Sequence, residues 1–218
     1  AVVLVGDFLY SKSILMAIGY QNVKILEVLL DATTRMSEGE VLQLVHSDNL
    51  EITEQEYLQV ITRKTAVLIS AACQVGAIFG GGGTAEEKAL GTYGHSLGIA
   101  FQLIDDTLDF TGQAEELGKP VGNDVQEGKA TLPLICAYRN AKPIEKQRLR
   151  QIFSADEISS KDTLELTNIV IRTGGIEYTH NLASKYARQA REVLRIFPES
   201  PVKQILESIA EYVVHRRT

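Results

Sequence analysis

The sequence has little cysteine and no excess of positive charge. Its two cysteines, Cys73 and Cys136, lie far apart and form no C-x-x-C pair, which argues against a disulfide framework or a zinc site and favours a reducing cytoplasm. The formal net charge of −6 argues against a protein that binds nucleic acid or an anionic membrane through its overall charge. Any basic site must therefore be local.

Several motifs of known chemistry are also absent. The chain contains no G-x-x-x-x-G-K-[ST], no H-E-x-x-H and no G-x-S-x-G, which argues against a P-loop, a zinc protease helix and a nucleophile elbow. The E-x-x-H from Glu177 to His180 stands alone, whereas a carboxylate-bridged di-iron bundle needs two. No signal peptide precedes Ala1, and residues 1–5 already look helical. We therefore expect the sequence to begin within a domain whose N-terminal part is missing.

Apolar helical periodicity runs through most of the chain. With 44% hydrophobic and 23% charged residues, it suits one compact domain over residues 1–218. Short loops between long helices, without a strand pattern, predict an all-α antiparallel helical bundle, and residues 111–128 read as a loop. The expected helices cover residues 2–18, 21–36, 39–45, 53–79, 84–110, 132–139, 143–153, 163–172, 176–196 and 201–216.

Two uncharged runs raise the question of a membrane. Residues 65–85 and 89–104 carry no charge, and the first is long enough on length alone to cross a bilayer. Ser70, Gln74 and the four glycines from Gly80 to Gly83 interrupt the first run. We expect both runs to be central helices of a soluble bundle, with membrane spanning as the alternative.

The segment from Phe101 to Asp109 concentrates carboxylates on a helix. Residues on a helix are about 100° apart, so Asp105 and Asp109 share one face, while Asp106 lies further round and Gln102 sits between. Mg²⁺ is usually held by one or two carboxylates, waters and substrate phosphates, so this spacing suits a magnesium site. The alternative is a solvated acidic helix end, although the uncharged residues before it indicate that the helix is buried.

Three glycines continue the acidic face toward the start of the same helix. Gly91, Gly94 and Gly98 follow the spacing of Gln102 and Asp105. Their missing side chains leave space that the apolar part of a ligand could occupy. The alternative is close packing of a neighbouring helix.

Candidate cations surround the aspartates in the sequence. Lys64 falls on the apolar stripe that includes Tyr57, Ile61 and Leu68, so it should point inward and need an anion such as diphosphate. The alternative is a structural salt bridge to a carboxylate such as Asp7. The loop after the aspartates adds Lys119 and Lys129 among glycines, which suits a lid over phosphate groups or an ordinary surface loop.

Taken together, these segments resemble the trans-isoprenyl (polyprenyl) diphosphate synthases of the long-chain type. The pair FQxxDDxxD and GKxTLP is highly specific, and all the matches occur in family order across the whole chain. The matching segments are residues 6–9, 39–44, 63–65, 98–109, 118–120, 123–124, 128–133 and 212–216.

The resemblance implies a bundle of the isoprenoid synthase type with a central cavity, and a prenyltransferase reaction. In that reaction an allylic diphosphate loses diphosphate with Mg²⁺ assistance, and isopentenyl diphosphate attacks the resulting cation to give a longer trans-polyprenyl diphosphate. The family is usually homodimeric. By analogy the metal residues are Asp105, Asp106 and Asp109, the residues facing the cation are Thr65 and Gln102, and the diphosphate-binding residues are Lys64, Lys119, Lys129 and Arg216.

One departure from the family pattern is important. The family carries a second aspartate-rich DDxxD motif earlier in the chain, and none precedes Asp105 in this sequence. We expect the chain as given to be poorly active by itself. Two alternatives therefore stay open beside the complete enzyme, namely a non-catalytic subunit of a heteromeric prenyl synthase and a class I terpene synthase.

Overall fold

The computed structural model describes residues 1–111, 122–155 and 157–216, and these residues form helices without any strand. This confirms the predicted all-α class. The α-helices are α1 (Val2–Ile18), α2 (Val23–Val45), α3 (Glu54–Ile61), α4 (Val67–Phe79), α5 (Thr84–Thr111), α7 (Asn123–Gln126), α8 (Leu132–Asn140), α9 (Pro143–Phe153), α10 (Ser160–Arg172), α11 (Gly175–Val193) and α12 (Pro201–His215). A π-helical segment, η1 (Thr62–Ala66), joins α3 to α4, and a 3₁₀ turn, η2 (Leu194–Ile196), follows α11.

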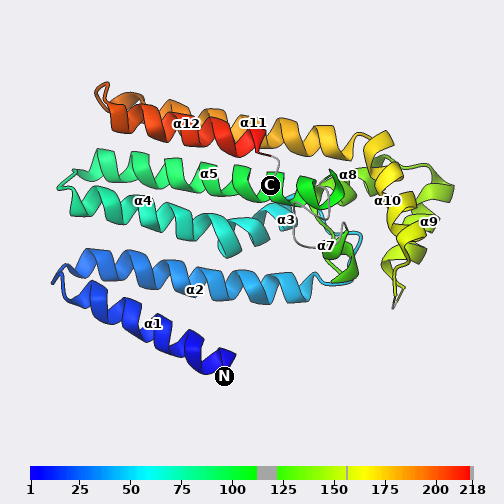
Figure 1. The fold of residues 1–218 in the computed structure, drawn as a ribbon, viewed down its shortest axis with the longest axis horizontal. Helices are drawn as coiled ribbons and strands as arrows, with labels where there is room; N and C mark the ends of the chain where they lie inside the picture. The colour runs from blue at the N-terminus through cyan, green and yellow to red at the C-terminus, as the bar shows by residue number, and fades with distance from the viewer. Residues whose placement is uncertain (112–121, 156, 217–218) are drawn as a thin grey trace.

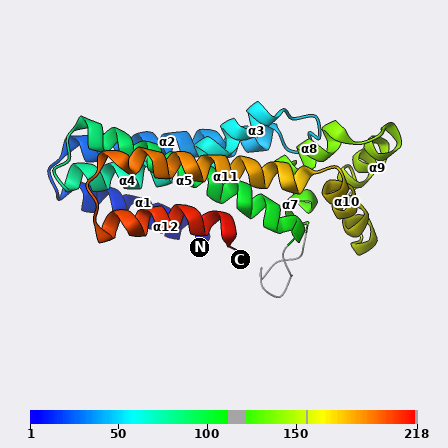
Figure 2. The ribbon, with the colours of Figure 1, turned by 90° about the horizontal axis from the view of Figure 1, so that it is seen from above.

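The long helices run side by side as antiparallel hairpins (Figure 1). Helix α5 is central, because α4 packs along one side of it and α11 and α12 pack along another. The shorter helices α8, α9 and α10 gather at one end of the bundle, and the view from above shows α11 lying over α5 (Figure 2). The antiparallel bundle expected from the sequence is confirmed.

The core lies between α5 and α11. Large apolar side chains of α5, such as Leu103, are fully buried against the small residues Ala183, Ala187 and Ala190 of α11. Those alanines recur every three or four residues and so share one face of the helix. The Tyr93 hydroxyl donates to the carbonyl of Leu206 over 2.8 Å, which ties α12 to the same core.

The expected break between residues 36 and 39 is wrong, because α2 continues without interruption through Gly39. A Cβ atom at Gly39 would lie 2.5 Å from the backbone nitrogen of Lys64. Real Cβ atoms essentially never approach so closely. Glycine therefore serves here to bring the backbone of α2 against the π-helical segment.

The helix expected over residues 53–79 begins as predicted but is not a uniform α-helix. Thr53 and Glu56 form the expected capping box, in which the Thr53 hydroxyl accepts from the Glu56 amide and the Glu56 carboxylate accepts from the Thr53 amide. Such a cap satisfies two amides that a helix start leaves without partners. Farther along, residues Thr62–Ala66 adopt the wider π-helical turn.

The glycine face of α5 packs against another helix, so the hypothesis that it holds a ligand is wrong. A Cβ atom at Gly94 would lie 2.5 Å from the Ile69 carbonyl oxygen of α4, and one at Gly98 would lie 2.6 Å from the Cα of Ala66. Within the ranges described, no helix is both long and apolar enough to cross a bilayer.

Candidate functional site

A pocket of about 290 Å³ lies where the end of α2, the α3–η1 segment, α5 and residues 124–131 meet. Six residues predicted from the sequence line it, together with Tyr57, Gln43 and Asp124. We call it the aspartate pocket. Those six predicted residues are Lys64, Thr65, Gln102, Asp105, Asp106 and Lys129.

Asp106 is the most strongly perturbed group of the aspartate pocket. Its residue is only 3% exposed, and burial, helped by the nearby Asp124 and Asp105, raises its pKa to about 7. The hydroxyl of Tyr57 and the side-chain amide of Gln102 (2.8 Å) donate to its two oxygens and oppose that rise in pKa. A carboxylate in this position gains stabilisation from any cation that enters the pocket.

The hydrogen bonds extend beyond Asp106 to the π-helical segment. The Thr65 hydroxyl donates to the Gln102 side-chain oxygen over 2.9 Å, while the nitrogen of the same amide faces Asp106. Thr65, Gln102, Asp106 and Tyr57 therefore form one continuous chain of hydrogen bonds. It links η1, α5 and α3 along the wall of the pocket.

Asp105 faces the open side of the pocket and contacts the end of α12. Arg216 donates to the Asp105 carboxylate at 3.4 Å and to the Phe101 carbonyl at 3.2 Å. Its guanidinium also lies 4.1 Å from the centroid of the Phe101 ring, an arrangement that favours a cation over an aromatic face. Arg216, predicted to lie near the substrate, is thus beside the aspartates.

Asp109 lies apart from the aspartate pocket. It is fully buried and accepts a hydrogen bond from the backbone amide of Asp124 over 3.2 Å. That contact joins the end of α5 to the start of α7. Asp105 and Asp106, rather than Asp105 and Asp109, are the two neighbours on α5 that line the pocket.

Two lysines, Lys64 of η1 and Lys129 after α7, line the aspartate pocket. The Lys64 ammonium donates to Glu40 at 3.2 Å and to Gln43 at 2.8 Å, both on α2. The carboxylate that pairs with Lys64 is therefore Glu40, and not Asp7 of α1. The Lys129 ammonium pairs with Glu127. Both side chains are about one-third exposed, which leaves them open to an anionic ligand. Lys119 lies outside the described residues.

The donors of the aspartate pocket suit a divalent cation that arrives with a phosphate ligand. In the described part of the chain, no three His, Cys, Asp or Glu side chains are grouped closely enough to hold a metal ion by themselves. Mg²⁺ needs only one or two carboxylates when waters and substrate phosphates complete its shell. Asp105 and Asp106 provide that number.

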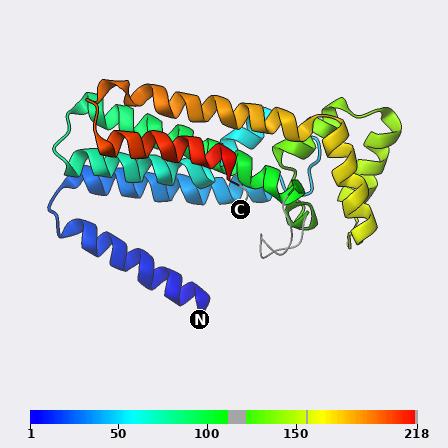
Figure 3. The same ribbon diagram turned by 45° about the horizontal axis from the view of Figure 1, so that its top comes forward.

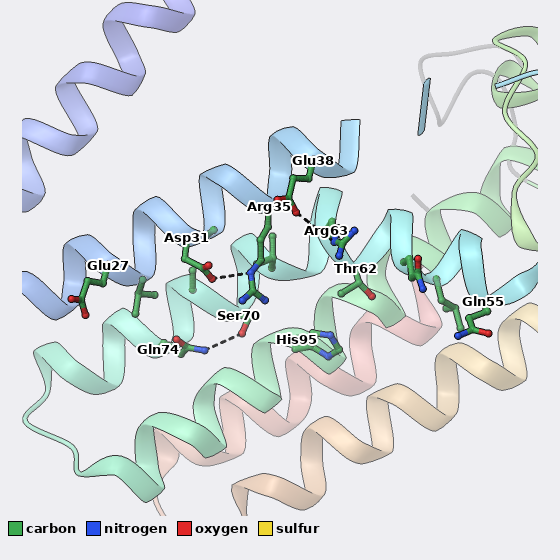
Figure 4. A pocket seen from close by; sticks show the side chains of 16 residues that line it. Glu27, Asp31, Arg35, Glu38, Gln55, Thr62, Arg63, Ser70, Gln74 and His95 are labelled. Atoms are coloured by element: carbon green, nitrogen blue, oxygen red, sulfur yellow. Dashed lines mark hydrogen bonds and ion pairs between the residues drawn. The ribbon is translucent and has the colours of Figure 1, made fainter. Parts of the chain in front are cut away.

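A larger groove of about 1000 Å³ contains none of the predicted site residues (Figure 4). It is lined by α2, the α3–α4 segment and His95 of α5. Both of its arginines are already paired, with Arg35 bound to Asp31 at 2.9 Å and Arg63 to Glu38 at 3.7 Å. Burial lowers the pKa of His95, as expected for a structural histidine.

Sequence reasoning missed the polar role of Tyr57. Its spacing on α3 placed it among apolar residues, and its ring is indeed buried. The hydroxyl nevertheless reaches Asp106, a residue 49 positions away in the chain. A buried tyrosine usually finds a hydrogen-bond partner, but spacing along one helix cannot identify that partner on another.

Comparisons with known proteins show the family to which the chain belongs. The family model "Polyprenyl synthetase" matches residues 1–170. Octaprenyl diphosphate synthase of Escherichia coli is 40% identical over 217 residues, covering 99% of this chain and 67% of that protein. The short chain isoprenyl diphosphate synthase of Methanothermobacter thermautotrophicus is 39% identical, covering 98% of this chain and 66% of that protein.

Solved structures show the same similarity. A polyprenyl synthase from Caulobacter crescentus, complexed with calcium and isoprenyl diphosphate, matches with a TM-score of 0.95 and 39% identity, over 99% of this chain and 66% of that one. A decaprenyl diphosphate synthase from Rhodobacter capsulatus matches with a TM-score of 0.92 and 38% identity, over 99% of this chain and 66% of that one. The chain therefore spans about two-thirds of the length of the relatives it matches.

Proposed function

Because this chain belongs to the polyprenyl synthetase family, whose activity is the condensation of allylic diphosphates with isopentenyl diphosphate, we propose that the protein makes a longer trans-polyprenyl diphosphate. The observation that supports the proposal is the aspartate pocket. There Asp105 and Asp106 lie in one cavity with Lys64 and Lys129. Carboxylates for a divalent cation and ammonium groups for phosphate oxygens are the two kinds of group that a diphosphate leaving group needs.

The proposed reaction breaks the bond between the allylic carbon and the diphosphate oxygen, and the electron pair leaves with the diphosphate. Lys64 and Lys129 hold that developing negative charge. The oxygens of Thr65 and Gln102 face the allylic cation, whose positive charge they stabilise. The double bond of isopentenyl diphosphate then forms the new carbon–carbon bond, and the proton lost afterwards goes to the released diphosphate.

A divalent cation, when bound, neutralises the diphosphate and improves it as a leaving group. The Caulobacter crescentus relative is described with calcium, and we propose Mg²⁺ as the ion used by this protein. Asp105 and Asp106 would hold it, and Asp109 would support that end of α5. Lys119 and Arg216 are proposed as further contacts to the substrate phosphates.

Product analysis tests the function directly. We expect the full-length protein, incubated with farnesyl diphosphate, radiolabelled isopentenyl diphosphate and MgCl₂, to yield labelled polyprenyl diphosphates, and EDTA to abolish them. A terpene synthase would instead release a hydrocarbon when isopentenyl diphosphate is omitted. No labelled product from folded protein would contradict the proposal.

A subunit role is the second candidate, and one relative favours it. Heptaprenyl diphosphate synthase component 2 of Bacillus subtilis is 34% identical over 212 residues and is named as a component. Activity that appears only after a second polypeptide is added would favour the subunit.

We further propose a homodimer located in the cytoplasm. Helix α1 packs against α2 and diverges from it toward the N-terminus (Figure 3). Its large apolar side chains, among them Leu4 and Phe8, are exposed. Burial of such a surface is strongly favourable in water. Light scattering should give twice the monomer mass, and Phe8→Glu should shift that mass toward the monomer.

A further inference from the structure

We propose that Tyr57 is a positioning residue for the aspartate pocket, where its hydroxyl holds the Asp106 carboxylate in the orientation required to bind a divalent cation together with a diphosphate. This inference rests on the proposed function of the same pocket. It assigns a role to a residue whose position in the sequence indicates only core packing.

The geometry around Asp106 leaves it little freedom. Tyr57 donates to one carboxylate oxygen, and Gln102 donates to the other at 2.8 Å. Gln102 is itself held by the Thr65 hydroxyl. Because donors approach both oxygens, the plane of the carboxylate is fixed relative to α5. Loss of either donor would allow the carboxylate to rotate.

Tyr57 is well suited to act as a permanent donor. Its ring is buried in the main core, and its hydroxyl lies at the wall of the pocket, where it donates to Asp106. A phenol O–H is a donor, whereas an ionised carboxylate only accepts.

The positioning role differs from a structural role in what it affects. A hydroxyl that only stabilised the fold would change the melting temperature and leave ligand binding intact. A hydroxyl that orients Asp106 affects the binding of the cation, whereas binding of metal-free diphosphate depends on the lysines. The two kinds of binding can be measured separately on the same protein.

Tyr57→Phe in the full-length protein tests this by calorimetry with MgCl₂ and inorganic diphosphate. We expect the affinity for Mg²⁺ in the presence of diphosphate to fall about tenfold, since a hydrogen bond to a charged group is lost. Diphosphate binding in EDTA should stay within about twofold of wild type. Tyr93→Phe, which removes a buried hydroxyl outside the pocket, serves as the matched control and should bind Mg²⁺ normally.

Other results would refute either the positioning role of Tyr57 alone or the proposed function as well. If wild type binds Mg²⁺ and diphosphate but Tyr57→Phe binds Mg²⁺ equally well, the positioning role is refuted and the proposed function stands. Equal loss in Tyr93→Phe would attribute the effect to general destabilisation and also refute the role. If folded wild-type protein binds neither ligand, both the inference and the proposed function fail.

Discussion

Helices α4 and α5 approach so closely that one added methyl group on α5 should push the two helices apart. At Gly94, an added Cβ would lie 2.5 Å from the Ile69 carbonyl oxygen and 2.8 Å from the Cα of Ser70. Both are backbone atoms, so no side-chain rotation can relieve the contact. We expect Gly94→Ala to destabilise the protein by forcing the two helices apart.

The change in the free energy of unfolding caused by Gly94→Ala is the sum of two opposing effects. Alanine in a helix interior gains about 0.5–1 kcal/mol over glycine, and overpacking a tight core costs about 1–3 kcal/mol. With two backbone contacts below 3.0 Å, the cost should be in the upper part of that range. The net effect at Gly94 is therefore a loss of about 1–2 kcal/mol in the free energy of unfolding.

Gly76 provides a matched control on α4. It lies within the helix, and an added Cβ there has nothing within 4 Å, so Gly76→Ala should stabilise the protein by about 0.5–1 kcal/mol. A chain of this size shifts in melting temperature by about 2–4 °C per kcal/mol, so the two variants should differ by about 3–12 °C. Differential scanning calorimetry measures that difference.

The opposite result would restore the hypothesis that the glycines make room for a ligand. If Gly94→Ala melts at the same temperature as Gly76→Ala yet binds an allylic diphosphate more weakly than wild type, then the space beside Gly94 holds substrate. Melting is measured without ligand, so the two explanations do not overlap.

Three further predictions concern the aspartate pocket. Asp105→Ala in the full-length protein should lower turnover at least about a hundredfold, because charge at the leaving group is no longer neutralised; near-normal rates would reject its role. Lys64→Ala should weaken diphosphate binding in EDTA about tenfold by calorimetry while the melting temperature is kept, and loss of the fold without a binding defect would favour a structural salt bridge. The pKa of Asp106 is raised to about 7 in the folded protein, so the protonated form of Asp106 stabilises the fold at low pH. In EDTA, the free energy of unfolding by urea should therefore fall as the pH rises from about 4 to about 7. Asp106→Asn should remove that slope, and an unchanged slope would contradict the assignment.

Much of the fold was predictable because its signals are local. The Thr53 capping box and the start of α9 at Pro143 lie at the predicted positions, since a cap and an N1 proline act on neighbouring amides. The convergence of Asp105, Asp106 and Lys64 on one pocket was also expected, because inward-facing charges in a bundle require partners.

What packs against the glycine face of α5 could not be predicted from local sequence signals. Spacing placed Gly91, Gly94 and Gly98 together on α5, but the absence of a side chain is equally compatible with a ligand or with a neighbouring helix. Only the position of α4 decides between them, and that position depends on contacts between residues distant in the chain. The Cβ distances to Gln74, Ile69 and Ala66 favour the helix.

The predicted apolar stripe is only partly correct beyond Ile61, because Leu68 is exposed whereas Ala71 of the same stripe is buried. A π turn holds one more residue than an α turn, so the following side chains are rotated by about 100°. Leu68, predicted to be buried, is accordingly 45% exposed, and Val67 is buried in its place. Neither glycine nor proline marks residues 62–66, and the backbone of α2 approaches this segment closely at Gly39. The wider turn also brings two consecutive residues, Lys64 and Thr65, onto the aspartate pocket. A segment that no local sequence signal predicts therefore carries two of the groups that the proposed chemistry requires.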